Sequence, residues 1–286
     1  MQSVLRILSS PAARYLTVPV LILAVYMAVN LSGKRRAVLR NYTLHSGRIG
    51  KPFRIVLVTD LHNCRYGSGM QVLLDLISAQ KPDCILLGGD LYHNRGNSAA
   101  DQLLSRLPSI APCCMVLGNH EKRRKDISSL RGRIGTFGIR LLGGENETLF
   151  PGITVTGIVD FGHKMPLHTL SQLRSAYRRL PPNGYRILLV HRPDLIPLFL
   201  RFDFDLILCG HTHGGQCRLP AHPSGLFAPG QGIFPKYAGG EYRVPHAQMI
   251  ISRGLSNKPW WAARIGNPPE LCVIDLLPDP QERESR

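Results

Sequence analysis

The sequence is short of acidic residues and has no CxxC cysteine pair. Its 286 residues carry 19 Asp and Glu against 35 Lys and Arg, which gives a formal net charge of +16. This imbalance favours anionic partners such as nucleic acid, acidic lipid headgroups or phosphorylated small molecules, and charge alone does not choose among them. The seven cysteines form no CxxC pair, which argues against a disulfide framework or a thiolate zinc knuckle. We expect most of them to be buried thiols in a reducing compartment.

Aromatic residues are also scarce, at 7% of the chain, and the sequence contains no recognisable nucleic-acid-binding module. Proteins that bind nucleic acid rely on aromatic stacking platforms or on groove-reading elements. A nucleic-acid substrate is therefore the weaker interpretation of the positive charge. Internal repeats and low-complexity tracts are absent as well, and 286 residues suffice for one sizeable core.

One long uncharged stretch, YLTVPVLILAVYMAVNLSG, lies near the N-terminus. Its length is at the lower end of the roughly 17–25 residues that cross a bilayer as a helix. No clear small-x-small cleavage site follows it, so we favour an uncleaved membrane anchor over residues 1–33 rather than a signal peptide. The basic residues that follow, from Lys34 to Arg40, predict that the C-terminal bulk of the chain lies on the cytoplasmic side of the membrane. A bent interfacial helix, permitted by Pro19, and a buried soluble helix are the alternatives.

Short apolar runs recur from residue 53 onward, and each ends in polar residues. They are typical of buried strands and comprise FRIVLVTDLH, DCILLGGDL, CCMVLGNHE, TVTGIVDFGH, YRILLVHRPD, DLILCGHTH, QMIISRG and LCVIDLL. Amphipathic stretches of helical spacing occur between several of them, at Met70–Ala79, Ala99–Leu107 and Thr169–Leu180. Strands that alternate with helices predict an α/β fold.

The same pass along the chain predicts its organisation. We expect a basic linker over 34–52, a catalytic domain over 53–278 and a polar tail over 279–286. Residues 214–245 are rich in Gly and Pro, and we expect a long, ordered loop region there.

Residues with related chemistry follow five of the apolar runs. They are Asp60 and His62, then Asp90, then Asn119 with His120, then His191, and finally His211 with His213. Because α/β proteins place ligands and catalysts at the carboxyl ends of strands, their joint occurrence is more informative than any single cluster. Carboxylates, an amide and imidazoles without thiolates suit borderline divalent ions such as Mn, Fe, Co or Zn. About seven candidate ligands predict two ions sharing a carboxylate, which is the usual device for attack at phosphorus.

This ordered set resembles the calcineurin-like metallophosphoesterase family. The family's blocks are read here as D-x-H at Asp60–His62, G-D at Gly89–Asp90, G-N-H-E at Gly118–Glu121, a single His191, and G-H-x-H at Gly210–His213. HRPD, GHTHGGQ and SRGL followed by NPPE are similar to the branch of membrane-associated bacterial phosphodiesterases. That branch includes enzymes similar to UDP-2,3-diacylglucosamine pyrophosphatase of lipid A biosynthesis. The resemblance implies a metallophosphoesterase β-sandwich of two mixed sheets flanked by helices (αββα).

The resemblance also implies a role for each matched position. Asp60, His62 and His213 would hold one metal ion, Asn119, His191 and His211 would hold the second, and Asp90 would bridge them. His120 would face the scissile phosphate, where an imidazole stabilises charge on phosphoryl oxygens or protonates the leaving oxygen. Water activated between the two ions (Mn, Fe or Zn) would be the nucleophile. Gly210, Gly214 and Gly215 would let the backbone turn tightly beside a phosphate.

Several further residues keep two interpretations. Arg123 and Arg124 in the run KRRK, and Arg253 in SRGL, are either substrate contacts or part of a solvated charged surface. Glu121 either orients its loop or is an ordinary carboxylate at a helix N-terminus. Cys64 is interpreted as a buried thiol outside the site. Trp260 and Trp261 either cover the substrate near a membrane or pack in the core.

Together these features predict an enzyme, a metal-dependent phosphoric ester hydrolase of the phosphodiesterase or pyrophosphatase type. The predicted substrate is a lipid-linked or nucleotide-sugar phosphate ester such as UDP-2,3-diacylglucosamine. We expect the enzyme to be single-pass or peripheral at the bacterial inner membrane, with its catalytic domain in the cytoplasm. A phosphodiesterase acting on nucleic acid or nucleotides is the alternative. A non-catalytic scaffold with the same fold ranks last, because every ligand position and His120 are filled.

Overall fold

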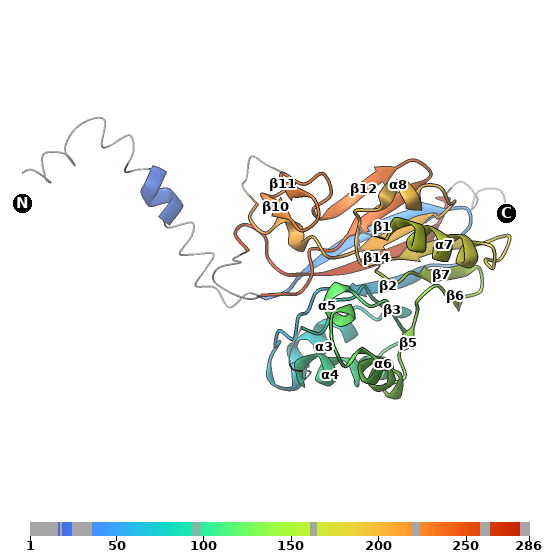
Figure 1. The fold of residues 1–286 in the computed structure, drawn as a ribbon, viewed down its shortest axis with the longest axis horizontal. Helices are drawn as coiled ribbons and strands as arrows, with labels where there is room; N and C mark the ends of the chain where they lie inside the picture. The colour runs from blue at the N-terminus through green and yellow to red at the C-terminus, as the bar shows by residue number, and fades with distance from the viewer. Residues whose placement is uncertain are drawn as a thin grey trace, which may run out of the picture.

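Two six-stranded sheets form the centre of the molecule (Figure 1). The computed structural model describes residues 17, 19–24, 36–93, 96, 98–160, 165–218, 224–257 and 264–280. The first sheet has the strand order β1-β14-β2-β3-β4-β5 and the second has the order β12-β13-β9-β8-β7-β6. A separate ribbon pairs β10 (Phe227–Ala228) with β11 (Gly232–Ile233) within the Gly- and Pro-rich region.

The first sheet is mixed. Its strands are β1 (Val38–Ser46), β2 (Phe53–Val58), β3 (Cys84–Leu87), β4 (Cys113–Met115), β5 (Arg140–Leu141) and β14 (Glu270–Pro278). From β2 to β5 neighbouring strands run parallel, whereas β14 runs antiparallel to β2 and parallel to β1. Every residue of β3 is buried, as is usual for a parallel strand covered on both faces.

The second sheet is also mixed. Its strands are β6 (Asn146–Phe150), β7 (Ile153–Gly157), β8 (Tyr185–Leu189), β9 (Leu206–Cys209), β12 (Gly240–Val244) and β13 (Ala247–Ile251). The four central strands run parallel, and the edge strands β6 and β12 pair antiparallel with their neighbours. The four parallel strands therefore end at the same edge of the sheet.

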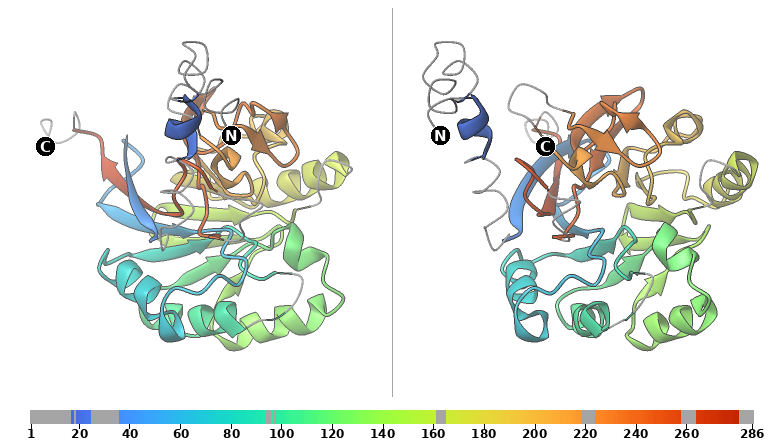
Figure 2. Two further views of the ribbon diagram at one scale, coloured as in Figure 1. Left: turned by 90° about the vertical axis from the view of Figure 1, so that its left-hand side faces the viewer. Right: turned by 60° about the vertical axis from the view of Figure 1, so that its left-hand side comes forward.

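The inner faces of the two sheets share one apolar core. Leu57 and Leu86 of the first sheet belong to the same buried cluster as Val155, Leu189 and Leu208 of the second. The outer face of the first sheet is covered by α3 (Gln71–Ser78), α4 (Ser98–Leu104) and α6 (Ile127–Thr136), and that of the second by α7 (Pro166–Tyr177) and α8 (Ile196–Phe199). Figure 2 shows the same layering from two further sides. The predicted sandwich of two mixed sheets flanked by helices is confirmed.

The eight apolar runs and the three amphipathic stretches form strands and helices as predicted, but the interpretation of residues 34–52 as a linker is wrong. This segment contains β1, which pairs with β14 from Val38 opposite Glu270 to Ser46 opposite Pro278. Only Leu44 of its nine residues is buried. Such a polar strand has no apolar run to reveal it.

The predicted membrane anchor over residues 1–33 lies largely outside the described residues. Among those that are described, no helix combines the length and the apolar character needed to cross a membrane. Trp260, Trp261 and the tail from residue 281 also lie outside the described part of the chain.

Candidate metal centre

The predicted ligands follow strands of both sheets. In the first sheet β2 leads to Asp60 and His62, β3 leads to Asp90, and β4 leads to Asn119 at the start of α5 (Asn119–Lys122). In the second sheet β8 leads to His191, and β9 leads to His211 and His213. Side chains that follow these strands meet at the carboxyl ends, which is where α/β proteins bind ligands. The topology thus brings together side chains that are far apart in the sequence.

Six of these side chains form two groups of potential metal ligands. Ligand atoms of Asp60, His62 and His213 all lie within 4.8 Å of one another, and we call this group the first cluster. Ligand atoms of Asp90, His191 and His211 meet the same limit and form the second cluster. His213 is partly exposed and the other five residues are buried. The two clusters correspond to the two sets that the resemblance implied, with Asp90 placed in the second.

Asp90 contacts both clusters. Its Oδ2 lies 3.2 Å from Nε2 of His191 and 3.9 Å from Nε2 of His62. The expected bridging position of this carboxylate agrees with these two distances.

Some buried polar atoms at the centre lack hydrogen-bond partners among the described residues. They include Oδ1 of Asn119, which is the amide expected in the second set, and Nε2 of His211. Since buried polar atoms are normally hydrogen-bonded, each such atom requires a partner of another kind. Carboxylate, amide and imidazole donors of this arrangement fit borderline divalent ions. The residues present therefore fit the metal ions that the sequence predicts.

The backbone at these positions adopts the left-handed conformation. The φ values are 52° for Asp60, 49° for His62, 54° for Asp90, 71° for His211 and 49° for His213. Non-glycine residues in this region are uncommon, and such strain concentrates at functional sites. Hydrogen bonds between strand ends maintain it, for example from the amide of His62 to the carbonyl of Asp90 at 3.0 Å.

Glycines admit close neighbours to the GHTHGG loop. A Cβ on Gly210 would collide with the carboxylate of Asp60, and one on Gly214 would collide with the side-chain amide of Asn267. Gly214 also has a φ of 64°. The amide of Asn267 donates to the carbonyls of His213 at 2.7 Å and Gln216 at 3.1 Å. The tight turn expected at this loop therefore leaves room for the side chain of Asn267 to pack against it.

Glu121 ties two of the ligand loops together. Its carboxylate accepts hydrogen bonds from the backbone amides of Asp90, Tyr92 and Gly118, each at 2.9 Å. Of the two interpretations left open, the orienting role is the one that these contacts support. Burial, together with the negative charge of Asp90, raises the pKa of Glu121 to about 8.

Burial sets the charge of the imidazoles in the first cluster. It lowers the pKa values of His62 and His213 to about 3, so both rings are neutral at pH 7. Neutral imidazole is the form that ligates a metal ion.

The pair of Asp90 and His191 behaves differently. Burial alone would lower the pKa of His191, but the adjacent carboxylate of Asp90 outweighs it and raises that pKa to about 10. In the same way burial would raise the pKa of Asp90, but His191 and the other imidazoles hold it well below its usual range. Without bound cations the two groups therefore form a buried ion pair, and an incoming cation would have to displace the proton of His191.

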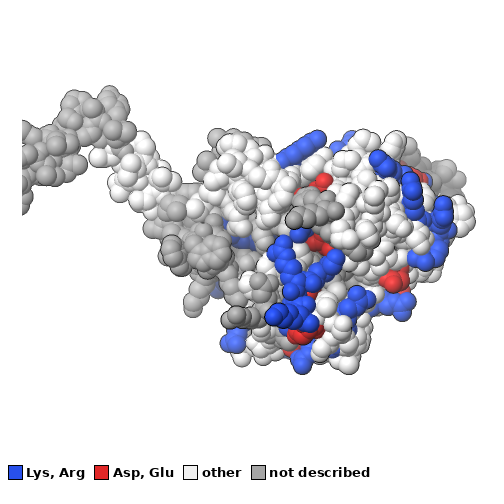
Figure 3. Space-filling model, viewed as in Figure 1, with Lys and Arg blue, Asp and Glu red and all other residues white. Residues whose placement is uncertain are grey.

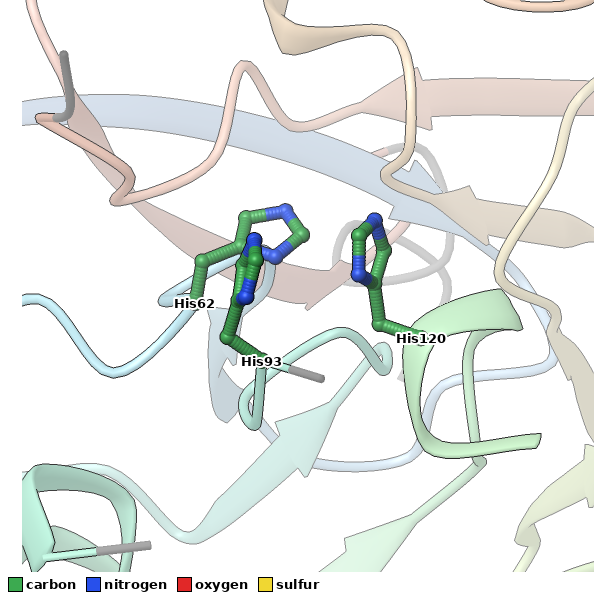
Figure 4. A group of neighbouring side chains, drawn as sticks. All are labelled: His62, His93 and His120. Atoms are coloured by element: carbon green, nitrogen blue, oxygen red, sulfur yellow. The ribbon is translucent and has the colours of Figure 1, made fainter. Parts of the chain in front are cut away.

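His120 lies beside the two clusters. Its backbone amide donates to Oδ1 of Asp90 at 2.8 Å, and its side chain is 23% exposed. Its ring centroid lies 4.6 Å from that of His62 and 5.0 Å from that of His93. Figure 4 shows the three rings around one space, with His120 projecting from α5. The sequence analysis missed His93. Its position three residues after Asp90 in the same loop is the feature by which it could have been found.

The arginines predicted as substrate contacts have other partners or an outward position. Arg124 pairs with Asp126 at 2.6 Å and donates to the carbonyl of His93. Arg253 lies 3.3 Å from the carboxylate of Glu270, and Arg123 is exposed at the end of α5. Figure 3 shows that Lys and Arg side chains gather over α5 on this face of the molecule.

Arg264 reaches the first cluster and was missed in the sequence. Its side chain is almost fully buried, and its Nη2 lies 3.5 Å from Nδ1 of His213. Burial lowers its pKa to about 10, so it stays charged at pH 7. A single arginine in a loop carries no periodic signal by which it could have been singled out.

Among the described residues, no cysteine belongs to either ligand cluster. Six of the seven thiols are buried and Cys217 is partly exposed, and all seven are free. Cys64 is fully buried, as expected of a thiol outside the site.

Comparison with known families matches residues 53–215 to the calcineurin-like phosphoesterase family. The chain belongs to this family. The match ends at the GHTHGG loop, so Arg264, Asn267 and Glu270 lie beyond it.

The chain is similar to several characterised bacterial proteins. UDP-2,3-diacylglucosamine pyrophosphatase LpxG of Chlamydia muridarum is 27% identical, over 49% of this chain and 42% of that protein. LpxG of Chlamydia trachomatis serovar D is 28% identical over the same shares. Phosphodiesterase YaeI of Escherichia coli K12 is 32% identical, over 50% of this chain and 54% of that protein. The chain therefore spans about half the length of the curated relatives it matches.

Proposed function

We propose that the chain is a dimetal phosphodiesterase or pyrophosphatase acting on a lipid-linked or nucleotide-sugar substrate at the cytoplasmic face of a membrane. The observation that carries the dimetal assignment is the pair of ligand clusters joined by Asp90. One divalent ion would use only half of this donor set. Two ions with a carboxylate between them would use all of it.

The residues that would hold the ions are those of the two clusters together with Asn119. The first ion would be held by Asp60, His62 and His213, and the second by Asn119, His191 and His211, with Asp90 shared. Mn, Fe or Zn suits these donors. Such a pair supplies Lewis acidity to the phosphoryl group and lowers the pKa of the attacking water.

His120 is the proposed proton donor to the leaving oxygen. Its ring stands next to the first cluster and is accessible, while its backbone is fixed by the hydrogen bond to Asp90. A positioned imidazole can stabilise charge on the phosphoryl oxygens or protonate the group that departs. Glu121 keeps the loops of Asp90 and His120 in register through its three backbone contacts.

The substrate class is supported by the relatives and by a cavity in the second sheet's half of the molecule. A cavity of about 960 Å³ lies between α8 and β12, and Asp194, three residues after His191 in the sequence, is one of its lining residues. Ile196, Leu200 and Tyr237 give it an apolar wall, which suits the organic part of a large ester. LpxG acts on UDP-2,3-diacylglucosamine by its name, and YaeI is a phosphodiesterase.

A substrate screen tests this proposal. Purified protein with added Mn is assayed against UDP-2,3-diacylglucosamine and other nucleotide-sugars, glycerophosphodiesters, cyclic nucleotides and polynucleotide at moderate salt. We expect turnover of a nucleotide-sugar or lipid-linked ester to exceed that of polynucleotide. Preferential cleavage of polynucleotide would instead support the nucleotide-directed alternative.

Membrane association has its own test. The uncharged N-terminal stretch and the basic residues after it support an anchor at the cytoplasmic face. Deletion of residues 1–33 should move the protein from the membrane fraction to the soluble fraction without loss of hydrolysis of a water-soluble ester. Unchanged fractionation would mean that this segment is not the sole anchor.

A further inference from the structure

Arg264 is a buried cation with incomplete pairing. Its side chain is 3% exposed, and its Nη1 has no hydrogen-bond partner among the described residues. The contact of Nη2 with His213, at 3.5 Å, is to a ring nitrogen and not to a carboxylate. In the described part of the chain no carboxylate forms an ion pair with Arg264. A guanidinium carries five N–H donors, and burying it without an anion is costly.

The carboxylate with the largest electrostatic effect on Arg264 has other partners. Asp60 is the carboxylate whose charge acts most strongly on this guanidinium. Under the proposed function Asp60 binds a divalent ion, and its carboxylate also accepts a hydrogen bond from the backbone amide of His211 at 3.0 Å. A loaded centre would therefore leave Arg264 with a positive charge and a donor pointing into a buried space. An incoming anion would both neutralise the positive charge and accept a hydrogen bond from the unpaired donor.

The backbone around Arg264 is held to the GHTHGG loop. The amide of Arg218 donates to the carbonyl of Ile265 at 2.8 Å, and Asn267 donates to the carbonyls of His213 and Gln216. These contacts of Ile265 and Asn267, which directly follow Arg264 in the chain, hold its backbone next to the first cluster before any substrate binds. A binding group that is held in place loses little entropy when its ligand arrives.

Other arginines near the centre already have carboxylate partners. Nε of Arg253 lies 3.3 Å from Glu270, and Nε of Arg192 donates to Asp160 at 2.8 Å. Arg264 is the one of these three that the described structure leaves without such a partner. Guanidinium groups match phosphoryl oxygens in geometry and bind them through two donors.

We infer that Arg264 binds a non-bridging oxygen of the phosphoryl group of the substrate, next to the first cluster. This inference rests on the proposed function, because it takes the phosphoester to be bound at the two clusters. Arg264 is then a substrate-binding residue supplied from outside the segment that matches the family.

Binding of inorganic phosphate to the Mn-loaded full chain tests the inference. Wild type, Arg264→Gln and Arg264→Lys are compared by isothermal titration calorimetry, with metal content measured on the same samples. We expect Arg264→Gln to keep its metal content and to bind phosphate about 10- to 100-fold more weakly, as for the loss of a hydrogen bond to a charged group. Arg264→Lys should be intermediate, because it keeps the charge and loses the fork geometry.

A matched control and a rescue separate binding from structure. Arg54 is half-buried, pairs with Asp275 at 2.6 Å and lies at the end of β2 away from the site. Arg54→Lys should leave phosphate affinity unchanged. Methylguanidinium added to Arg264→Gly should restore part of the phosphate affinity, which a purely structural role would not predict.

The outcomes are distinct. Loss of metal in proportion to loss of phosphate binding would show that Arg264 only supports His213, and unchanged phosphate affinity in Arg264→Gln would also overturn the inference. If Arg264→Gln fails to fold, as judged by circular dichroism, unchanged affinity in Arg264→Lys has the same meaning. Wild-type protein that hydrolyses no ester but binds phosphate through Arg264 would refute the proposed function alone.

Discussion

Oδ2 of Asp90 lies 3.2 Å from Nε2 of His191, although the two residues follow strands of different sheets. The same oxygen lies 3.9 Å from Nε2 of His62 in the first cluster. The centre therefore depends on how the sheets sit against each other, and the shared apolar core between their inner faces fixes that position. Packing far from the reactive atoms thus sets the ligand geometry.

Asp90→Asn should weaken metal binding at both clusters. The substitution keeps the size of the side chain but removes the charge that faces both His62 and His191. We expect metal affinity to fall by about 100-fold or more, beyond the loss seen when a partner of a ligand is removed, and ester hydrolysis to fall with it. Metal content by inductively coupled plasma mass spectrometry checks this. The control is Asp203→Asn, which alters an exposed carboxylate paired with Arg48. Full metal content and full turnover in Asp90→Asn would contradict the bridging role of Asp90.

His120→Asn should reduce turnover and leave the metals in place. The backbone amide that donates to Asp90 is unaffected by the change, and the ring stands outside both clusters. Loss of a positioned acid predicts a fall in kcat of about 10²- to 10⁴-fold with bis(p-nitrophenyl) phosphate. His246→Asn, at an exposed turn between β12 and β13, should have wild-type kcat. A parallel loss of metal in His120→Asn would indicate a ligand or structural role instead.

The ligands could be predicted from the sequence because buried parallel strands consist of continuous apolar runs. Cys84–Leu87 is buried along its whole length, so the polar Asp90 beyond it stands out. β1 could not be predicted in this way, because its partner β14 covers one edge while most of its side chains face solvent.

Arg264 escaped prediction for a different reason. Its importance comes from three-dimensional contacts, namely the bridge between Cys217 and Ile265 and the hydrogen bonds of Asn267. Nothing in the local pattern around Arg264 distinguishes it from the many other arginines of this basic chain. The grouping of ligands into two clusters is likewise a property of the fold, since sequence order alone does not determine which imidazoles meet.

Glu121→Gln should change the pH dependence of stability in the metal-free protein. Burial raises the pKa of Glu121 from 4.5 to about 8. The stability due to this raised pKa is fully present below pH 4.5 and is lost as the pH rises through about 8. The wild type should therefore lose stability relative to Glu121→Gln as pH rises, by up to about 1 kcal/mol per pH unit. Urea unfolding in the presence of a chelator measures this difference. If the free energies of unfolding of the two proteins changed with pH in parallel, the three backbone amides would keep Glu121 ionised.

Gly214→Ala should destabilise the GHTHGG loop and weaken the first cluster. A Cβ at this position meets the amide of Asn267, and the φ of 64° disfavours any side chain. We expect a loss of about 1–3 kcal/mol in the free energy of unfolding, together with a lower metal content, because His213 precedes the displaced residue. Gly132→Ala is the matched control, since a Cβ in that part of α6 has open space around it and alanine favours a helix by up to about 1 kcal/mol. Urea unfolding and metal analysis of the two variants check this prediction. Equal stability and full metal content in both variants would show that the loop tolerates a side chain and that Asn267 is not needed to hold His213.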